Sequence, residues 1–357
     1  MKFLLKNGRC IQLKIAIIGI GRWGRNHVRV VNSLIMMNKC EELTICDINK
    51  AIVRQVAREY GIDEYYYNLE ELIAKSHADA AIVSVPTVFH HKVCKKILPH
   101  MDVLVEKPLA GSLEEARELI DIARRMERIL AVGHIERYNQ AVLAVKELIR
   151  DLERDGEKPT YISAQRVGPG PPRNYTLNLG VAHDLLIHDI DVTNFLLEKK
   201  PQDVQAIAVK VEEFPYEVEI IATYRYEDGI IANLRASWRS KPNFKDRTLS
   251  IYLDGTLINL DYIYQSYTVE RGLVEQRASG SYEHIVLSYK AREELRRTLP
   301  PLMLKEPLLL EVDNFISALK GKEAFIVTGE EGFAALKCII YALKSAELNR
   351  RLKIEWS

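Results

Sequence analysis

The chain has 357 residues, 47% apolar and 28% charged, as in an ordinary globular protein with room for about two domains. Fifty basic and 49 acidic residues leave a formal charge of +1, so no overall field attracts nucleic acid or an anionic membrane. Five cysteines without a CxxC spacing indicate neither a disulfide framework nor a zinc site. No apolar stretch reaches the roughly 18 to 20 residues that span a bilayer. We therefore expect a cytoplasmic protein that binds neither nucleic acid nor membrane.

The first third of the chain alternates short apolar runs with amphipathic helical patterns. The apolar runs are KIAIIGIG (14–21), ELTICD (42–47), ADAAIVSVP (78–86), VLVEKP (103–108) and ILAVGH (129–134). This alternation is typical of βαβ units. It predicts an α/β domain over residues 1–133 with a doubly wound parallel sheet.

The remaining residues, 134–357, have a different texture. A helical segment is followed by strand-like text, and two amphipathic helices close the chain. Asp228-Gly229 and Asp254-Gly255 each stand between apolar runs, which is the strongest short-range signal of a β-hairpin. We expect a second, α+β domain with an open, mainly antiparallel sheet and helices on one face. The uncovered face is then a candidate contact between subunits, because a broad apolar face in water is unfavourable.

A glycine-rich turn directly follows the first predicted strand. Gly19, Gly21 and Gly24 form GxGxxG, in which glycine permits the tight turn, close approach of a pyrophosphate, and close packing of helix and strand. The second strand ends in Asp47, close to the position where a carboxylate binds the ribose 2′-hydroxyl. No arginine at positions 48 or 49 receives a 2′-phosphate. The motif predicts a Rossmann domain that binds NAD rather than NADP.

A charged residue ends a core strand at Lys107, and lysine is rarely buried. The carboxyl edge of a parallel sheet binds ligands, so a partly desolvated ammonium there could stabilise negative charge on a substrate oxygen. Asp184 and His188 are four apart in a helical segment and so share a face. A carboxylate beside an imidazole fixes its tautomer, and the imidazole can then accept a hydroxyl proton. The alternatives are a snorkelling lysine and a structural Asp–His pair.

The order GxGxxG, EKP, then D-x-x-x-H resembles the glucose–fructose oxidoreductase/inositol dehydrogenase/MocA (Gfo/Idh/MocA) family over nearly the whole chain. The resemblance implies an NAD-dependent oxidoreductase whose catalytic group is Lys107, Asp184 and His188. It also implies a homodimer or homotetramer. SVPTVFHH is similar to a loop of that family near the cofactor. The cofactor-binding residues expected in addition to the three glycines, Asp47 and Lys107 are Arg22, Trp23, Thr87, His90 and Glu106. No metal is expected: His183 and His188 are five apart, on different faces of an α-helix.

VGHIERYNQAV, AQRVGPGPPR, HDID and DYIYQ together resemble the UDP-N-acetylglucosamine 3-dehydrogenases of this family. That likeness implies oxidation of the 3-hydroxyl of a UDP-N-acetyl-hexosamine to a 3-keto sugar. Arg166 and Arg173 bracket a Pro/Gly-rich loop and are suited to a diphosphate. The other substrate-binding candidates, beside Asp184 and His188, are Arg137, Tyr138 and Asn139. Two alternatives stay open, an inositol or simple-sugar dehydrogenase and a non-catalytic dinucleotide sensor.

Overall fold

The computed structural model describes residues 13–171, 176–240, 244–272, 292–298 and 305–356. By their contacts these residues form two compact units. The first unit contains residues 13–138, 176–179 and 305–337, and the second contains the other described residues. The first unit is therefore built from the start of the chain and a later returning segment. These two units are defined by contacts between residues, which is a different criterion from a domain boundary along the chain. The boundary after residue 133 therefore stays a prediction.

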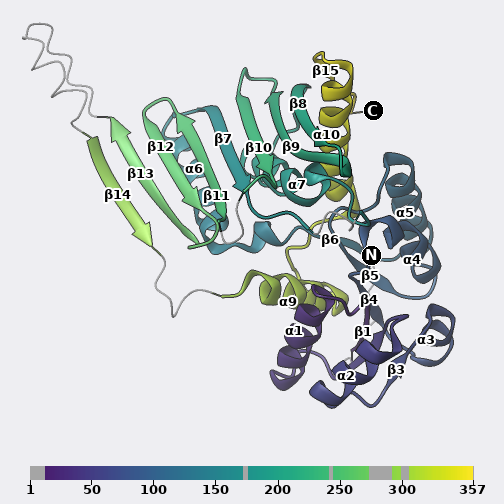
Figure 1. The fold of residues 1–357 in the computed structure, drawn as a ribbon. Helices are drawn as coiled ribbons and strands as arrows, with labels where there is room; N and C mark the ends of the chain where they lie inside the picture. Colours follow the sequence, from purple (N-terminus) through teal and green to yellow (C-terminus); the bar gives the residue numbers. More distant parts are fainter. Residues whose placement is uncertain (1–12, 172–175, 241–243, 273–291, 299–304, 357) are drawn as a thin grey trace, which may run out of the picture. The chain divides into compact units, whose positions relative to one another are not determined.

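The first unit is organised around a six-stranded sheet (Figure 1). In spatial order its strands are β3 (Tyr65–Tyr66), β2 (Glu42–Cys46), β1 (Lys14–Ile18), β4 (Ala80–Val83), β5 (Asp102–Glu106) and β6 (Leu130–Gly133). Every neighbouring pair is parallel. The order reverses between β1 and β4, so the predicted doubly wound sheet is confirmed. Ligands of such sheets bind outside the carboxyl ends of the strands at this reversal.

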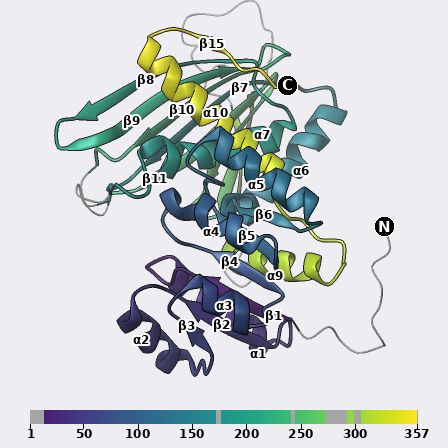
Figure 2. The ribbon, with the colours of Figure 1, turned by 90° about the vertical axis from the view of Figure 1, so that its right-hand side faces the viewer.

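Helices cover both faces of the parallel sheet. They are α1 (Gly24–Met36), α2 (Lys50–Tyr60), α3 (Leu69–Lys75), α4 (His90–Ile97), α5 (Leu113–Arg125) and α9 (Pro307–Leu319), with short turns η1 (Thr87–Phe89) and η2 (Ile135–Tyr138). Helices α1 and α9 contact each other on one face, and α4 and α5 contact each other on the opposite face (Figure 2). Strands covered on both sides carry continuous apolar runs. Accordingly, every residue of β4 is buried.

Helix α9 joins the first unit although it begins 174 residues beyond the end of β6 (307 − 133). Its apolar residues Leu308, Val312 and Phe315 belong to the same buried cluster as the apolar face of α1. The side chain of Arg29 pairs with Glu306 (Nη1–Oε2 3.0 Å), and Lys39 pairs with Asp313 (3.1 Å). Burial of the apolar face holds the helix, since exposed ion pairs contribute little.

The second unit contains a nine-stranded sheet (Figure 1). In spatial order its strands are β14 (Arg292–Thr298), β13 (Ser266–Gly272), β12 (Thr256–Asp261), β11 (Asp246–Leu253), β7 (Pro159–Val167), β10 (Ile231–Ser237), β9 (Phe214–Arg225), β8 (Asp203–Val211) and β15 (Leu352–Lys353). Only β7 and β10 pair in parallel; the other neighbours are antiparallel. Both Asp-Gly hairpins are confirmed, between β9 and β10 and between β11 and β12. The predicted mainly antiparallel sheet is therefore confirmed.

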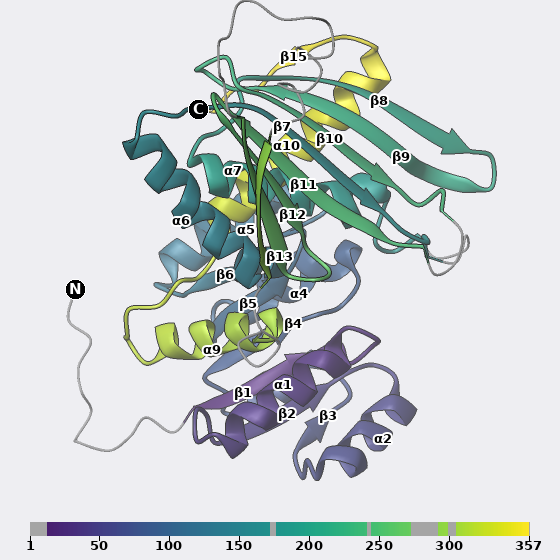
Figure 3. The same ribbon diagram turned by 90° about the vertical axis from the view of Figure 1, so that its left-hand side faces the viewer.

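Helices lie on one face of this sheet (Figure 3). Helix α6 (Gln140–Arg154) contacts β12 and β13, and α7 (Ile187–Leu197) contacts β7 and β10. From Cys338 onward, α10 (Gly329–Leu348) also belongs to this unit, where Tyr224 donates a hydrogen bond to the carbonyl of Cys338 (3.2 Å). The opposite face carries polar pairs across neighbouring strands, among them Asn233–Thr223 (2.8 Å). Its centre is thus more polar than the sequence led us to expect.

Candidate functional site

The glycine-rich turn has the form that a dinucleotide requires. Gly19 has φ of +84°, and a Cβ there would lie 2.7 Å from the backbone nitrogen of Val85. A Cβ on Gly24 would lie 1.9 Å from the carbonyl oxygen of Gly19, so helix α1 starts in tight contact with the turn. By contrast, a Cβ on Gly21 would meet no atom within 4 Å. The first and third glycines are needed by the fold itself, and the second faces open space, as the close approach of a pyrophosphate would require.

Asp47 stands beside this turn at the end of β2. Its Oδ2 accepts a hydrogen bond from the backbone N–H of Ile20 (2.9 Å), and its Oδ1 accepts one from Asn49 (2.8 Å). The side chain of Asn49 then caps α2 by accepting from Ala51 and Ile52. The carboxylate therefore fixes both the glycine turn and the start of the next helix. Each oxygen keeps a second lone pair for a hydroxyl group.

Glu106, at the end of β5, connects the strand-end lysine to the glycine turn. The carboxylate accepts hydrogen bonds from the indole of Trp23 and from His27 Nε2 (2.8 Å), and its other oxygen accepts from the N–H of Lys107 (3.3 Å). Burial opposes the charged form of Glu106, but the bonds from His27 and Trp23 outweigh it and hold its pKa below the usual range. Lys107 is half-buried, as expected of a strand-end ammonium at a ligand site.

His90 holds the backbone on the far side of Lys107. Its Nδ1 lies 2.7 Å from the carbonyl oxygen of Pro108, and its Nε2 lies 2.9 Å from that of Val85. Burial lowers the pKa of this histidine. Thr87 is also buried, and its N–H donates to Asn178 (3.1 Å). Among the other expected cofactor neighbours, Arg22 and Trp23 are exposed.

Asp184 and His188 lie where a π-helical turn, η3 (Ala182–Leu186), runs directly into α7. Between residues 181 and 193 these two are the only side chains that are not buried. An i→i+5 turn winds less per residue than an α-helix, so residues five apart lie closer to one face than they do in an α-helix. The α-helical argument that separated His183 from His188 therefore does not hold here. Even so, in the part of the chain that the structure describes, no three His, Cys, Asp or Glu side chains are arranged to hold a metal ion.

Two side chains that the sequence patterns did not indicate adjoin this helix. The indole N–H of Trp238 donates to Asp184 Oδ2 (3.3 Å), and Glu217 Oε1 accepts from the N–H of Ala182 (2.9 Å). Burial raises the pKa of Glu217. A Cβ on Gly180 would lie 2.2 Å from Glu217 Oε1, so only glycine leaves room for this carboxyl group. No local pattern reveals either residue, because both act across the sheet.

Arg166 is only 1% exposed and lies beneath α7. Its Nε and Nη2 both donate to Oδ1 of the buried Asp189 (3.0 and 2.9 Å), and its guanidinium lies over the ring of Tyr262, 4.6 Å from the centroid. To reach a substrate diphosphate, Arg166 would have to leave Asp189. Instead, the guanidinium of Arg166 holds Asp189, the residue after His188, against β7.

The other expected substrate residues also make contacts inside their own units. Arg137 is buried and pairs with Glu331, whose pKa stays low because this pairing and the bonds from Thr328 outweigh its burial. The hydroxyl of Tyr138 donates to the carbonyl of Phe325 (3.0 Å). Asn139 caps α6 and donates to the carbonyl of Tyr262 (3.0 Å). Arg173 lies outside the described residues.

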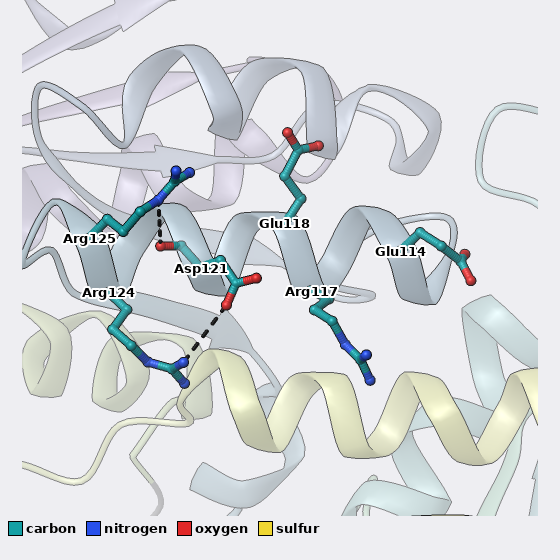
Figure 4. A pocket seen from close by; sticks show the side chains of 6 residues that line it. All are labelled: Glu114, Arg117, Glu118, Asp121, Arg124 and Arg125. Atoms are coloured by element: carbon teal, nitrogen blue, oxygen red, sulfur yellow. Dashed lines mark hydrogen bonds and ion pairs between the residues drawn. The ribbon is translucent and has the colours of Figure 1, made fainter. Parts of the chain in front are cut away.

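Two further features do not enlarge the candidate site. A surface hollow on α5 is lined only by charged side chains of that helix (Figure 4): Glu114, Arg117, Glu118, Asp121, Arg124 and Arg125. None of these residues belongs to the motifs above. Among the described helices, none is long and apolar enough to cross a membrane.

Comparison with known proteins covers most of the chain. Residues 13–134 match the model described as "Oxidoreductase family, NAD-binding Rossmann fold". Residues 157–354 match "Oxidoreductase family, C-terminal alpha/beta domain". The glycine turn and Asp47 lie in the first match, and Asp184 and His188 lie in the second.

Individual relatives match over nearly their whole length. A UDP-N-acetylglucosamine 3-dehydrogenase of Acidithiobacillus ferrooxidans is 25% identical over 94% of this chain and 98% of its own. The solved structure of that protein has a TM-score of 0.76 and covers 95% of this chain and 99% of its own. A myo-inositol 2-dehydrogenase of Thermotoga maritima is 24% identical over 96% and 99%. Levoglucosan dehydrogenase, solved with NADH, is 15% identical over 96% and 99%, with a TM-score of 0.82, and shows the fold alone.

Proposed function

This chain belongs to the Gfo/Idh/MocA oxidoreductase family, and we propose that it is a dehydrogenase that oxidises a sugar hydroxyl with NAD. Its N-terminal part is an NAD-binding Rossmann domain. The observation that carries the proposal is that Asp184 and His188 are only partly buried on an otherwise buried helical segment. We assign this carboxylate and this imidazole to substrate because they are the side chains that the segment leaves partly accessible.

The proposed chemistry divides the work among three side chains. Bound NAD would supply the hydride acceptor. His188 takes the hydroxyl proton as a general base, and Asp184 sets its tautomer and stabilises the imidazolium. Lys107 hydrogen-bonds the same oxygen and stabilises its developing negative charge. Together these roles describe oxidation of a CH–OH group to a ketone.

The residues around the glycine turn are proposed to hold the cofactor. The open space at Gly21 suits the pyrophosphate, and Asp47 is the proposed partner of the adenosine ribose. Thr87 and His90 are buried, so we propose that they act by fixing backbone near the cofactor rather than by touching it. Arg22 and Trp23, which are exposed on the turn, are the better candidates for direct contact.

The proposed substrate is a UDP-N-acetyl-hexosamine oxidised at its 3-hydroxyl. A relative with that name matches 94% of the chain, and the motifs around residues 132–142 and 164–173 support it. An inositol or simple sugar is the second candidate. One observation favours it: Arg166 and Arg137 are buried and paired with carboxylates, whereas a free sugar needs no cation for a diphosphate.

The test is steady-state NADH formation with UDP-N-acetylglucosamine, free N-acetylglucosamine, glucose and inositols as substrates. We expect turnover with the nucleotide sugar and little with the free sugars. Brisk oxidation of inositol or glucose without turnover of any UDP-sugar would transfer the assignment to the second candidate. A protein that binds NAD but oxidises none of them would be a dinucleotide sensor.

A homodimer or homotetramer is part of the proposal. The sheet face opposite α6 and α7 carries exposed apolar side chains, among them Ile207 and Tyr252, beside its polar pairs. Light scattering at micromolar concentration tests it, and a monomer would contradict it. A cytoplasmic location also stays a prediction.

A further inference from the structure

A β-bulge in β9 lies directly against the helix that carries Asp184. Strand β8 pairs Val209 with Glu219 but its next residue, Lys210, with Glu217, so Val218 is an extra residue on β9. Glu217 therefore faces the π-helical turn, where it accepts from Ala182. Glu219, two residues on, pairs with Arg235 and Arg239 instead. Bulges near active sites commonly redirect a side chain in this way.

The same bulge also places Trp238. The carbonyl oxygen of Val218 accepts a hydrogen bond from the backbone N–H of Trp238 (2.8 Å). The ring of Trp238 packs edge-on against the ring of Phe214, which is on β9 like Val218, with 5.8 Å between the two ring centroids. On its other side, a Cβ on Gly170 would lie 2.8 Å from the Cβ of Trp238. With its backbone and ring both fixed, the indole N–H points at Asp184 Oδ2 (3.3 Å).

We propose that Trp238 and Glu217 are positioning residues for the catalytic carboxylate, an inference that rests on the proposed role of Asp184. Glu217 fixes the backbone at the start of the π-helical turn, and Trp238 fixes the carboxylate itself. Side chains that lock a functional group in its productive geometry act on rate more than on ground-state binding. Both residues should therefore affect kcat while leaving NAD affinity unchanged.

The tryptophan arm has a matched control in this chain. Trp238→Phe keeps an aromatic ring and removes the N–H bonded to Asp184. Trp356→Phe removes an equivalent N–H, which donates to the carbonyl of Pro201 (2.7 Å). We expect kcat to fall by about ten- to a hundredfold in Trp238→Phe, in line with one hydrogen bond to a charged group, and to stay within twofold in Trp356→Phe. Equal kcat in both variants would overturn the proposal.

The glutamate arm has a control on the same strand. Glu217→Gln keeps an oxygen that accepts from Ala182, whereas Glu217→Ala removes it. We expect Glu217→Gln to retain most of kcat and Glu217→Ala to lose about tenfold, the effect of one net hydrogen bond at the upper end of its usual range. Glu219→Gln, which faces away from the helix, should leave kcat unchanged. If Glu217→Ala does not fold, Glu217→Gln remains as the test. A tenfold loss of kcat in Glu217→Gln would contradict the proposal that the oxygen bonded to Ala182 positions the turn.

Two measurements separate this inference from the proposed function. In an Asp184→Ala background, which has no oxygen left to accept from the indole, Trp238→Phe should have no further effect on kcat if it acts through Asp184. Independently of turnover, the imidazole of His188 can be titrated by NMR in the NAD-bound enzyme. We expect its pKa to fall in Trp238→Phe toward the value in Asp184→Asn, and not to change in Trp356→Phe. An unchanged titration would overturn the inference even if dehydrogenase activity were established, and a shift without any activity would contradict only the proposed function.

Discussion

In the first unit the proposed site residues stand at the ends of parallel strands, whereas in the second unit they stand on a helix that lies on one face of a mainly antiparallel sheet. Glu106 and Lys107 take their places from the backbone pairing of β5 with β4 and β6. Asp184 and His188 have no such ladder, and buried side chains from the sheet hold their helix instead. The first arrangement should be sensitive to backbone changes at glycine, and the second to loss of buried polar partners.

The largest expected effect comes from removing one proposed catalytic side chain from each unit. Lys107→Ala and His188→Ala should each lower kcat by roughly 10²- to 10⁴-fold, the usual contribution of a general acid or base. NAD affinity, measured by fluorescence titration, should change little in His188→Ala, because the histidine lies outside the nucleotide-binding unit. Full turnover in His188→Ala would leave Lys107 as the sole candidate for proton transfer.

The buried ion pair beneath α7 tests whether side chains hold that helix. Arg166→Met removes the guanidinium that pairs with the buried Asp189 carboxylate. It should lower the free energy of unfolding in urea by about 3–5 kcal/mol. Adding Asp189→Leu should recover most of this loss, because a buried apolar pair leaves no charge without a partner. Arg29→Met, which removes an exposed pair, should lose no more than about 1 kcal/mol. Similar losses in both single variants would contradict the distinction.

Asp47 tests the nucleotide side. Asp47→Ala should weaken NAD by about ten- to a hundredfold, since a hydrogen bond to a charged group contributes about 1.5–3 kcal/mol. NADP, which lacks the free 2′-hydroxyl, should lose less. Because Asp47 also holds Ile20 and Asn49, Asp47→Asn is the control that keeps one acceptor oxygen. Equal losses for both cofactors in calorimetric titrations would assign Asp47 to the turn alone.

The smallest effect concerns Glu311 on α9, whose two carboxyl oxygens are buried and have no hydrogen-bond partner among the residues that the structure describes. Burial, and next the charge of Glu106, raise the pKa of Glu311 well above its usual value. A raised pKa stabilises the fold below the ordinary pKa, and this stability is lost as pH rises through the folded value. Glu311→Gln should therefore raise the free energy of unfolding at pH 8 by about 1–3 kcal/mol, which is seen as a higher melting temperature. Near pH 4 the melting temperature should change little.

Glu331 supplies the control of opposite sign for Glu311. Its pKa is lowered, so it stabilises the fold above its ordinary pKa, and that stability is lost as pH falls through the folded value. Glu331→Gln should lower the melting temperature at pH 8, and this effect should shrink as the pH falls through the lowered pKa of Glu331. The same pH trend in both variants would show that these carboxyl groups do not govern stability as assigned.

Local sequence signals predicted the elements that short-range geometry controls. GxGxxG located the turn, both Asp-Gly pairs located hairpins, and the run before Lys107 located a buried strand. The return of α9 to the first unit depends on contacts with residues more than 270 positions earlier in the chain, which no local sequence window detects. The π-helical turn reads as ordinary helix, and Arg166 reads as a free cation because its partner is on another element. Sequence patterns reveal which groups are present more readily than which groups already have partners.

The extra residue in β9 bears on how this chain tolerates changes in length. In a regular strand, residues two apart point the same way, yet Glu217 and Glu219 make contacts on opposite sides because Val218 is inserted between them. A chain lacking residue 218 would lose the irregularity between Val209 and Lys210, although not the one between Lys210 and Val211, and would still direct the two carboxylates to opposite faces. A deletion at this one position should therefore be far milder than a deletion on either side, which would exchange the faces of every residue in one part of the strand.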